Sequence, residues 1–357
     1  MKIGILTHHY VNNFGAFLQA YALREAVAKA FPNDTVEVID YINVKQFVIN
    51  TGGWFRFYKD RENAHCWLEK IRVPLTFLKA RKQHLVCSSK CYTTKQVNRL
   101  SYDVILVGSD EVWNYQDKRS TARIKFAHGL ECENIIAYAP SVGNSQGDIP
   151  QYVSEGIKHF AALSARDEKT SQLIRTITGT EPEKVLDPTF LSAFPTNHCK
   201  KLKRPYILFY YCDKLPKQIK NQILAYAQEH GLAVYGAGEC DARYSDITVN
   251  LTPFEWVDMF RNAEFVFTGT FHGAVFSILN HRQFKVYLTN KSRIEKVGSL
   301  LKDCGIHNRG IEESFVFDLE SMVNEIDYGA VDAKLKQRRE QSMAYLCSNI
   351  ECCRNKE

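Results

Sequence analysis

The chain has 357 residues, which is long for one ordinary domain, because domains usually contain about 100–200 residues. Its composition, 45% hydrophobic and 24% charged, is typical of folded globular proteins and excludes extended disorder. No apolar run approaches the roughly 18 residues of a membrane span, and the first apolar run breaks at His8, too early for a signal peptide. We therefore expect two domains and a cytoplasmic protein.

The eleven cysteines show neither a disulfide framework nor a zinc motif. Their number is odd, no two have the CxxC spacing, and no suitably spaced histidine joins the clusters at 87–91 and 347–353. We expect reduced thiols and no metal site.

The net charge of +6 is unevenly distributed. Residues 43–99 contain twelve Lys and Arg against three acids, so this segment carries +9 and the rest of the chain carries −3. Such a basic segment suits a phosphate-bearing partner or an anionic membrane face, and a solvated helical insertion is the alternative.

Short apolar strands alternate with helices along the chain. In the first half we expect strands at 2–7, 35–40, 103–107, 134–139, 160–166 and 184–186, and a helix to about residue 30. In the second half we expect strands at 206–211, 231–235, 264–268 and 283–288, and helices at 216–230, 253–262, 272–280 and 331–348.

This alternation predicts two α/β domains with parallel sheets. The first domain spans residues 1–194 with a basic helical insertion at about 43–100, and the second spans 195–330, beginning with a polar linker at 195–204. A C-terminal helix and tail follow at 331–357. Ligands of such sheets bind beyond the carboxyl ends of the strands, so we expect the site in a cleft between the domains.

The sharpest candidate site is the strand-to-helix turn at residues 265–274. Thr270 is a candidate N-cap, which places His272 in the first helical turn, where the helix dipole favours anions. Gly273 leaves room for a ligand, and His272 is a candidate proton donor. Local packing of the histidine is the alternative.

Two further candidates follow strands of the first half. Asn13 and Gly15 suit a turn around an oxygen-rich ligand, with Gln19 one helical turn later. Ser109 and Asp110 follow a buried strand, so Asp110 is a candidate general base, with a helix cap as its alternative role. Trp113 is a candidate platform for a sugar ring.

Arginines supply the candidate anion clamps. Arg166 leaves a strand and offers a planar fork to a carboxylate or phosphate, unless it pairs with a neighbouring acid. Arg293 opens a helix one strand after His272.

Together these segments resemble the polysaccharide pyruvyl transferase family. The matching segments occur in family order, from residue 2 to about 310: KIGILTHHYVNNFGAFLQAYAL, VGSDEVWN, AYAPSVGN, LSARDEKT, VLDPTFL, TGTFHGAVFSI and SRIEKVGSLL. The resemblance implies a GT-B-like fold with two Rossmann-like domains facing a cleft. It also implies transfer of a pyruvyl group from phosphoenolpyruvate to a sugar of a cell-surface polysaccharide or its lipid-linked precursor, giving a pyruvate ketal without metal or organic cofactor.

The resemblance also assigns residue roles. His272 matches the motif histidine, for phosphoenolpyruvate binding and proton transfer, and Arg166 matches a motif arginine that clamps the carboxylate or phosphate. Where many members carry Arg-Leu-His, this chain has Thr270, Phe271 and His272. We hypothesise that Arg293 supplies the missing charge.

Two other functions remain open at this point. One is a GT-B-like glycosyltransferase that uses a nucleotide sugar, and the other is a non-catalytic glycan-binding subunit. The basic segment suggests peripheral contact with the inner membrane surface, where a polyprenyl-diphosphate-linked acceptor resides. Nucleic acid is not expected, because no recognised binding module is present.

Overall fold

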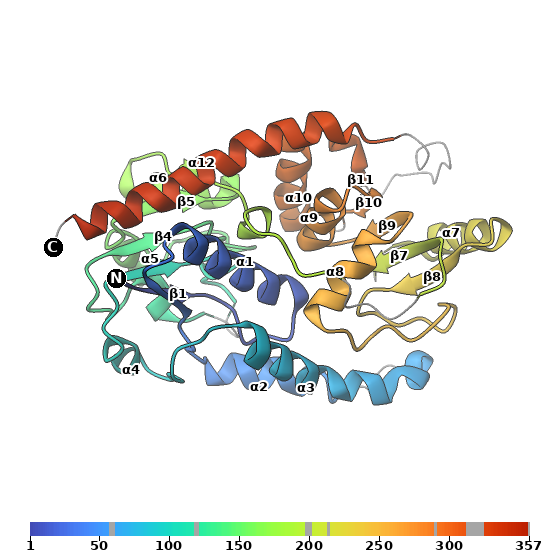
Figure 1. Cartoon of the computed structure of the whole chain (residues 1–357), viewed down its shortest axis with the longest axis horizontal. Coiled ribbons are helices and arrows are strands. Elements are labelled where there is room, and N and C mark those ends of the chain that lie inside the picture. The colour runs from blue at the N-terminus through green and yellow to red at the C-terminus, as the bar shows by residue number, and fades with distance from the viewer. Residues whose placement is uncertain are drawn as a thin grey trace. The chain divides into compact units, whose positions relative to one another are not determined.

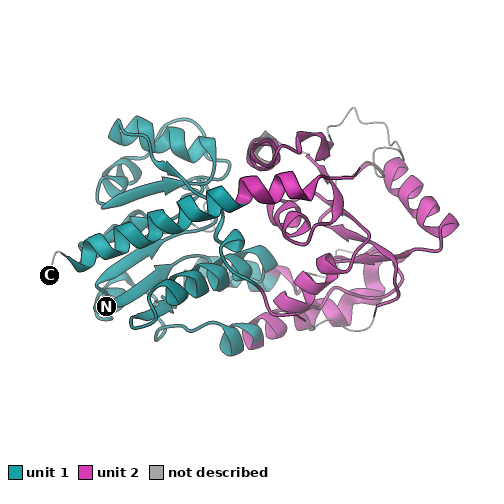
Figure 2. Ribbon diagram, turned by 45° about the horizontal axis from the view of Figure 1, so that its top comes forward, with its two compact units in different colours: residues 1–52, 80–193, 336–357 teal, residues 53–79, 194–335 magenta. Residues whose placement is uncertain are grey.

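The computed structural model describes residues 1–56, 61–117, 121–196, 202–212, 215–288, 291–311 and 325–355, without the side chains of residues 291–293. Figure 1 shows the order of the elements along the chain. The chain forms two compact units (Figure 2): unit 1 contains residues 1–52, 80–193 and 336–357, and unit 2 contains residues 53–79 and 194–335.

Unit 1 is built on a parallel sheet. Its strands within the described residues lie in the order β2-β1-β3-β4-β5-β6. Their bounds are β1 Lys2–Leu6, β2 Thr35–Val38, β3 Val104–Val107, β4 Ile135–Ala137, β5 Ala162–Ala165 and β6 Glu183–Lys184. The helices of the first half are α1 Phe14–Ala30, α2 Val44–Gly53, η2 Arg61–Cys66, α3 Trp67–His84, α4 Thr94–Asn98, η3 Arg123–Phe126, α5 Gln151–Ile157, α6 Glu168–Thr178 and η4 Pro188–Phe190.

Unit 2 has a second parallel sheet in the order β11-β10-β9-β7-β8. Its strands are β7 Tyr206–Tyr210, β8 Ala233–Gly236, β9 Phe265–Thr268, β10 Gln283–Tyr287 and β11 Gly310–Ile311. The helices of the second half are α7 Lys217–Glu229, α8 Pro253–Arg261, α9 Phe271–Leu279, α10 Lys291–Cys304, η5 His307–Arg309 and α12 Tyr328–Arg354, of which α12 belongs to unit 1 from residue 336 onward. The two sheets confirm the predicted class of two Rossmann-like α/β domains.

The unit boundaries differ from the predicted domains in two places. Residues 53–79, predicted as part of an insertion in the first domain, group with unit 2, and residues 336–357 group with unit 1. The expected cleft between domains stays a prediction. None of the helices in the described part of the chain is both long enough and apolar enough to cross a membrane.

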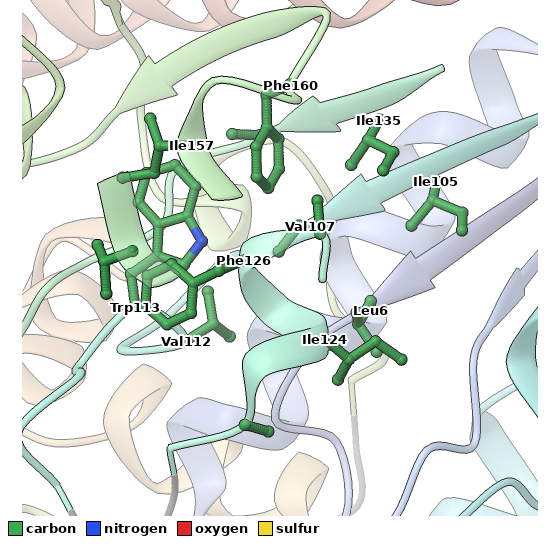
Figure 3. Packing of buried hydrophobic residues seen from close by; sticks show 14 of the residues in the cluster. Leu6, Ile105, Val107, Val112, Trp113, Ile124, Phe126, Ile135, Ile157 and Phe160 are labelled. Carbon is green, nitrogen blue, oxygen red and sulfur yellow. The ribbon is translucent and has the colours of Figure 1, made fainter. Parts of the chain in front are cut away.

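The unit 1 sheet has an apolar core on each face, because successive side chains of a strand point to opposite sides. Ile3, Ile5 and Leu106 pack on one face with residues of α1 and α12 such as Val27 and Ile350. The other face packs against α5, α6 and η3, and Figure 3 shows part of this second cluster, which includes Leu6, Ile105, Val107, Trp113, Phe126 and Ile157.

The unit 2 sheet is covered in the same way. Ile207, Phe209 and Phe267 pack with the α7 residues Ile219 and Ile223 on one face. On the other side an aromatic group joins strand and helices: the ring of Tyr210 lies 4.9 Å from that of Trp256 in α8, which lies 5.0 Å from that of Phe276 in α9.

One cysteine pair corrects the expectation that all thiols are reduced. Cys66, at the end of η2, forms a disulfide with Cys240, which follows β8. The two lie 174 residues apart in sequence, so spacing gave no sign of the pairing. Among the other described cysteines, those with free thiols include Cys87, Cys91, Cys132, Cys347 and Cys352.

Gly108, directly after β3, has a backbone conformation that requires glycine. Its φ is +131°, and a Cβ there would collide with the carbonyl oxygen of Tyr138. Positive φ at this value suits glycine alone, so the turn that carries Ser109 and Asp110 depends on this residue.

We expect Gly108→Ala to lower the free energy of unfolding by at least about 2 kcal/mol, from backbone strain together with overpacking. Gly147→Ala is the matched control, because Gly147 also has positive φ, +73°, but no atom lies within 4 Å of a Cβ there. The control should lose only about 1 kcal/mol. Urea unfolding measures both, and equal losses would contradict the steric argument.

Candidate functional site

In unit 1 the strand order reverses next to β1. The chain passes from β1 to β2 on one side and then returns to place β3 on the other side. Ligands of open parallel sheets bind at the carboxyl ends beside such a reversal. Thr7 and His8 follow β1 there, and Ser109 and Asp110 follow β3.

His8 and Lys125 form a buried pair at this position. The Lys125 ammonium donates to Nδ1 of His8 at 2.9 Å, and Nε2 of His8 lies 3.4 Å from the carbonyl oxygen of Glu111. Burial and the neighbouring lysine lower the pKa of His8 to about 3, so the ring is neutral. Burial lowers the pKa of Lys125 from 10.5 to about 7, against the opposing effects of Asp110 and Asp117. Lys125 therefore changes charge near neutral pH.

Arg166 lies after β5 and pairs with two acids. Its guanidinium contacts the buried carboxylate of Asp187, after β6, and lies 3.2 Å from that of Asp110. Burial acts to lower the pKa of Arg166, but Asp187 and then Asp110 raise it above the usual value, so the group stays charged. Asp110 has φ +71°, and its side chain is 20% exposed whereas that of Asp187 is 0% exposed. Asp110 is the carboxylate of this group that reaches solvent.

Ser109 and Gln19 lie beneath this group, where both are fully buried. The backbone N–H of Ser109 donates to Oε1 of Gln19 at 3.1 Å, and Nε2 of Gln19 donates to the hydroxyl of Thr7 at 2.8 Å. The Ser109 hydroxyl accepts from Arg166 at 3.2 Å. Ser109 and Gln19 have no exposed surface, and they join the ends of β1 and β3. That they touch substrate stays a prediction.

Trp113 lies in the core of unit 1. We expected a sugar platform, but the residue is fully buried among core side chains (Figure 3). Its ring lies 5.3 Å from that of Phe160 and 6.0 Å from that of Phe126, and its indole N–H donates to the carbonyl oxygen of Lys125 at 2.8 Å. Trp113 therefore packs in the core of unit 1 and is hydrogen-bonded to the backbone at Lys125.

Asn13 and Gly15 lie at the start of α1. The Asn13 side chain is the N-cap and accepts from the backbone N–H of Ala16 at 3.0 Å, while Gly15 is buried in the first turn. Capping occupies the side-chain oxygen of Asn13. Whether either residue meets a ligand stays a prediction.

Unit 2 repeats the strand reversal between β7 and β9. Thr270 follows β9 and caps α9, accepting from the backbone N–H of Gly273 at 3.0 Å, as predicted. His272 lies in the first turn, partly exposed, with its ring 5.4 Å from that of Phe271. A Cβ at Gly273 would collide with the Thr268 hydroxyl, so this glycine lets α9 pack closely against the end of β9.

The structure thus gathers the predicted residues into two groups. Asp110, Arg166, Ser109 and Gln19 meet in unit 1, and Thr270, His272 and Gly273 meet in unit 2, and each group lies at the carboxyl ends of strands. The Arg293 side chain lies outside the described residues.

Comparison with known proteins identifies the family. A family model described as polysaccharide pyruvyl transferase matches residues 13–289. The chain belongs to the polysaccharide pyruvyl transferase family. This is a family of transferases, and the match confirms the resemblance seen in the sequence.

Solved structures of other proteins are similar at low identity. The heptosyltransferase WaaC of E. coli with ADP is 11% identical, covering 95% of this chain and 100% of its own, with a TM-score of 0.40. The glycosyltransferase SnogD of Streptomyces nogalater is 11% identical, covering 99% of each chain, with a TM-score of 0.43. The UDP-GlcNAc 2-epimerase of Neisseria meningitidis, bound to UDP-GlcNAc, is 9% identical over 100% of both chains, with a TM-score of 0.48. No curated protein matches the sequence.

Sequence reasoning did not single out Lys125, His8 and Asp187, which the structure brings together with the predicted residues of unit 1. Lys125 lies in η3, a short turn between strands whose other residues are Arg123, Ile124 and Phe126, and which carries no recognisable motif. His8 lies two residues after β1 and Asp187 three residues after β6, so their position after strands was the available signal.

We expect Lys125 to make stability depend on pH. The unfolded lysine has a pKa of 10.5 and the folded one about 7, so between these values the unfolded chain binds more protons. The free energy of unfolding of the wild type should therefore rise from pH 7 to pH 9, and Lys125→Met should remove this rise. Urea unfolding at several pH values measures it, with Lys158→Met, at an exposed lysine of the same unit, as control. An equal slope in wild type and Lys125→Met would contradict the buried-lysine assignment.

Proposed function

We propose that this transferase moves the pyruvyl group of phosphoenolpyruvate to two hydroxyls of a sugar, in a cell-surface polysaccharide or its lipid-linked precursor. The family match over residues 13–289 carries the proposal. The residues at the two strand reversals support it, because they offer a histidine at a helix start and one partly exposed carboxylate beside a buried arginine.

The reaction needs two proton movements. Two C–O bonds form between the sugar oxygens and the central carbon of phosphoenolpyruvate, and the bond from that carbon to the phosphate oxygen breaks. One hydroxyl proton must reach a base, the methylene carbon must gain a proton to become a methyl group, and the other proton leaves with phosphate. The products are the ketal and hydrogen phosphate, so no oxidant or reductant is needed.

His272 suits the donor side of this chemistry. It lies in the first turn of α9, where the helix dipole stabilises anions such as phosphate and carboxylate. An imidazole there can donate a proton to the methylene carbon. In the proposal, Arg293 adds the positive charge that the family motif supplies by arginine.

Asp110 suits the acceptor side. Its carboxylate reaches solvent, and the buried guanidinium of Arg166 fixes the orientation of this carboxylate. A carboxylate in this position can accept the hydroxyl proton of a sugar. Lys125 has a pKa of about 7, so the charge beside Asp110 changes with pH near neutrality. We assign Lys125 a positioning role. The guanidinium of Arg166 forms ion pairs with Asp110 and Asp187. In the proposal Arg166 therefore orients the base, in place of the predicted role as a clamp for the substrate.

We expect His272→Asn to reduce kcat about 100-fold or more, the usual effect of losing a general acid. The assay follows inorganic phosphate released from labelled phosphoenolpyruvate, together with the mass gained by a panel of nitrophenyl and lipid-linked sugars. His281→Asn is the matched control, because His281 lies just beyond the other end of α9 and is exposed at 50% of its side chain. It should keep full activity.

Two outcomes would contradict the proposal. Release of nucleoside diphosphate from a nucleotide sugar, without phosphate release from phosphoenolpyruvate, would indicate a glycosyltransferase. Sugar binding that His272→Asn leaves intact, with no turnover in the wild type, would indicate a glycan-binding subunit.

We also propose that α2 and α3 touch an anionic membrane surface that holds a lipid-linked acceptor. On α2, Val44, Phe47 and Val48 share one exposed face, and α2 has no buried residue. On α3, Leu68 and Leu75 are 68% and 60% exposed.

The α3 helix has two apolar faces, which a solvated helix does not need. Val73, Phe77 and Ala80 form its buried face, and Leu68, Leu75 and Leu78 form the exposed one at helical spacing. The segment around both helices carries +9 over residues 43–99. Exposed apolar side chains with surrounding positive charge are typical of helices that lie on anionic bilayers.

We expect the protein to sediment with vesicles of anionic phospholipid at low salt and to lose this binding in high salt. The double variant Val48→Glu and Leu75→Glu should reduce the bound fraction several-fold. Ile294→Glu, at an exposed isoleucine of α10, is the control and should bind like the wild type. Absence of binding at low salt would reject the membrane contact while leaving the transferase assay unaffected.

A further inference from the structure

Three side chains of the kinds that ligate zinc meet in unit 2. His65 and Cys66 end η2, and Cys240 follows β8. Their ligand atoms all lie within 4.8 Å of one another, and Nε2 of His65 lies 3.4 Å from Sγ of Cys240. A cysteine pair needs no histidine to form a disulfide, so the third side chain points to a further role for this group.

The surroundings of these side chains favour a cation. They line a pocket of about 100 Å³ that also includes Glu239, Asp241 and Asp246, so carboxylates lie beside the three ligands. Asp241 is paired with Lys220 and Arg243, which leaves Glu239 and Asp246, within the described part of the chain, as the acids of this pocket outside an ion pair. The space holds an ion and at least one water molecule. His65 is exposed while Cys66 is buried, so solutes reach the group from the histidine side.

The backbone frame is wide for a disulfide. The Cα atoms of Cys66 and Cys240 are 6.7 Å apart, near the upper limit of the range for disulfides. The same segment is tied to unit 2 at a second place, where Thr76 donates to the Asn250 side chain at 2.7 Å and Asn250 donates to Glu69 at 3.0 Å. The ligands are therefore held near one another without depending on the disulfide alone.

We propose that the reduced cysteine pair and His65 form a zinc site, with a water molecule as the fourth ligand. Thiolate sulfur and imidazole nitrogen are the ligands that Zn²⁺ prefers, in a tetrahedral arrangement. The disulfide is the oxidised, metal-free form of this site. A dithiol reductant supplies two electrons and two protons to give two thiols and becomes a disulfide itself, and Zn²⁺ then displaces the two thiol protons into solvent.

The site joins the segment of residues 53–79 to the loop after β8, so zinc would fix that segment on unit 2. This role is structural, because no residue of the proposed transfer reaction belongs to it. The inference thus stands apart from the proposed function.

The experiment uses the full chain, reduced and then incubated with excess zinc and dialysed without oxygen. Elemental analysis should give about one zinc per chain, and Co²⁺ in its place should give the visible absorption of a tetrahedral thiolate site. His65→Ala should weaken zinc binding by about 100-fold or more, since even partners outside the first coordination sphere contribute 10–100-fold. Because His65 is exposed, this variant keeps its fold.

Cys66→Ser and Cys240→Ser should each abolish stoichiometric binding, and Cys352→Ser, at an exposed free thiol, should leave it unchanged. Peroxide oxidation should restore the disulfide and release the zinc. The inference is overturned if the reduced wild type retains no zinc, if His65→Ala binds zinc as tightly as the wild type, or if reductants leave the disulfide intact.

Discussion

The charge of Arg166 holds together the carboxyl ends of three strands in unit 1. The arginine follows β5, and its two partners, Asp187 and Asp110, follow β6 and β3. Removing Arg166 would leave the buried carboxylate of Asp187 without a compensating charge, which costs far more than the pair contributes when complete. The network therefore fixes where the single solvent-reaching carboxylate lies. The buried residues Ser109 and Gln19 extend this constraint to β1.

Much of the fold was predictable because buried parallel strands are short apolar runs that end at polar or glycine residues. The runs ending at Leu6, Val107 and Thr268 show this, and the structure places strands at each. The place of residues 53–79 was not predictable, because it depends on contacts such as Thr76 with Asn250 that are far apart in sequence. The two-residue strand β11 was too short to produce a pattern.

Residues of the candidate site were predictable where their position after a strand was enough to place them there, as for Asp110 and Arg166. Side-chain direction was a different question. Trp113 lies four residues after the turn at Ser109, and nothing in the sequence distinguishes a ring that faces a ligand from one that enters the core. Lys125 was missed for the opposite reason, because lysine is almost never fully buried and a lysine between apolar residues suggests a solvated turn. Its burial follows from tertiary packing around Trp113.

The division of the chain between its units has a practical consequence for anyone who wishes to express them separately. The polypeptide passes from one unit to the other after residues 52, 79, 193 and 335, so unit 1 is made of three pieces of sequence and unit 2 of two. Truncation at any single codon therefore leaves one unit lacking part of itself. Splitting the gene at the linker near residue 194 would leave unit 1 without the end of α12, including Leu346 and Ile350, which fill its core. An isolated unit 1 would need its C-terminal helix rejoined by an artificial connection or a circularly permuted gene.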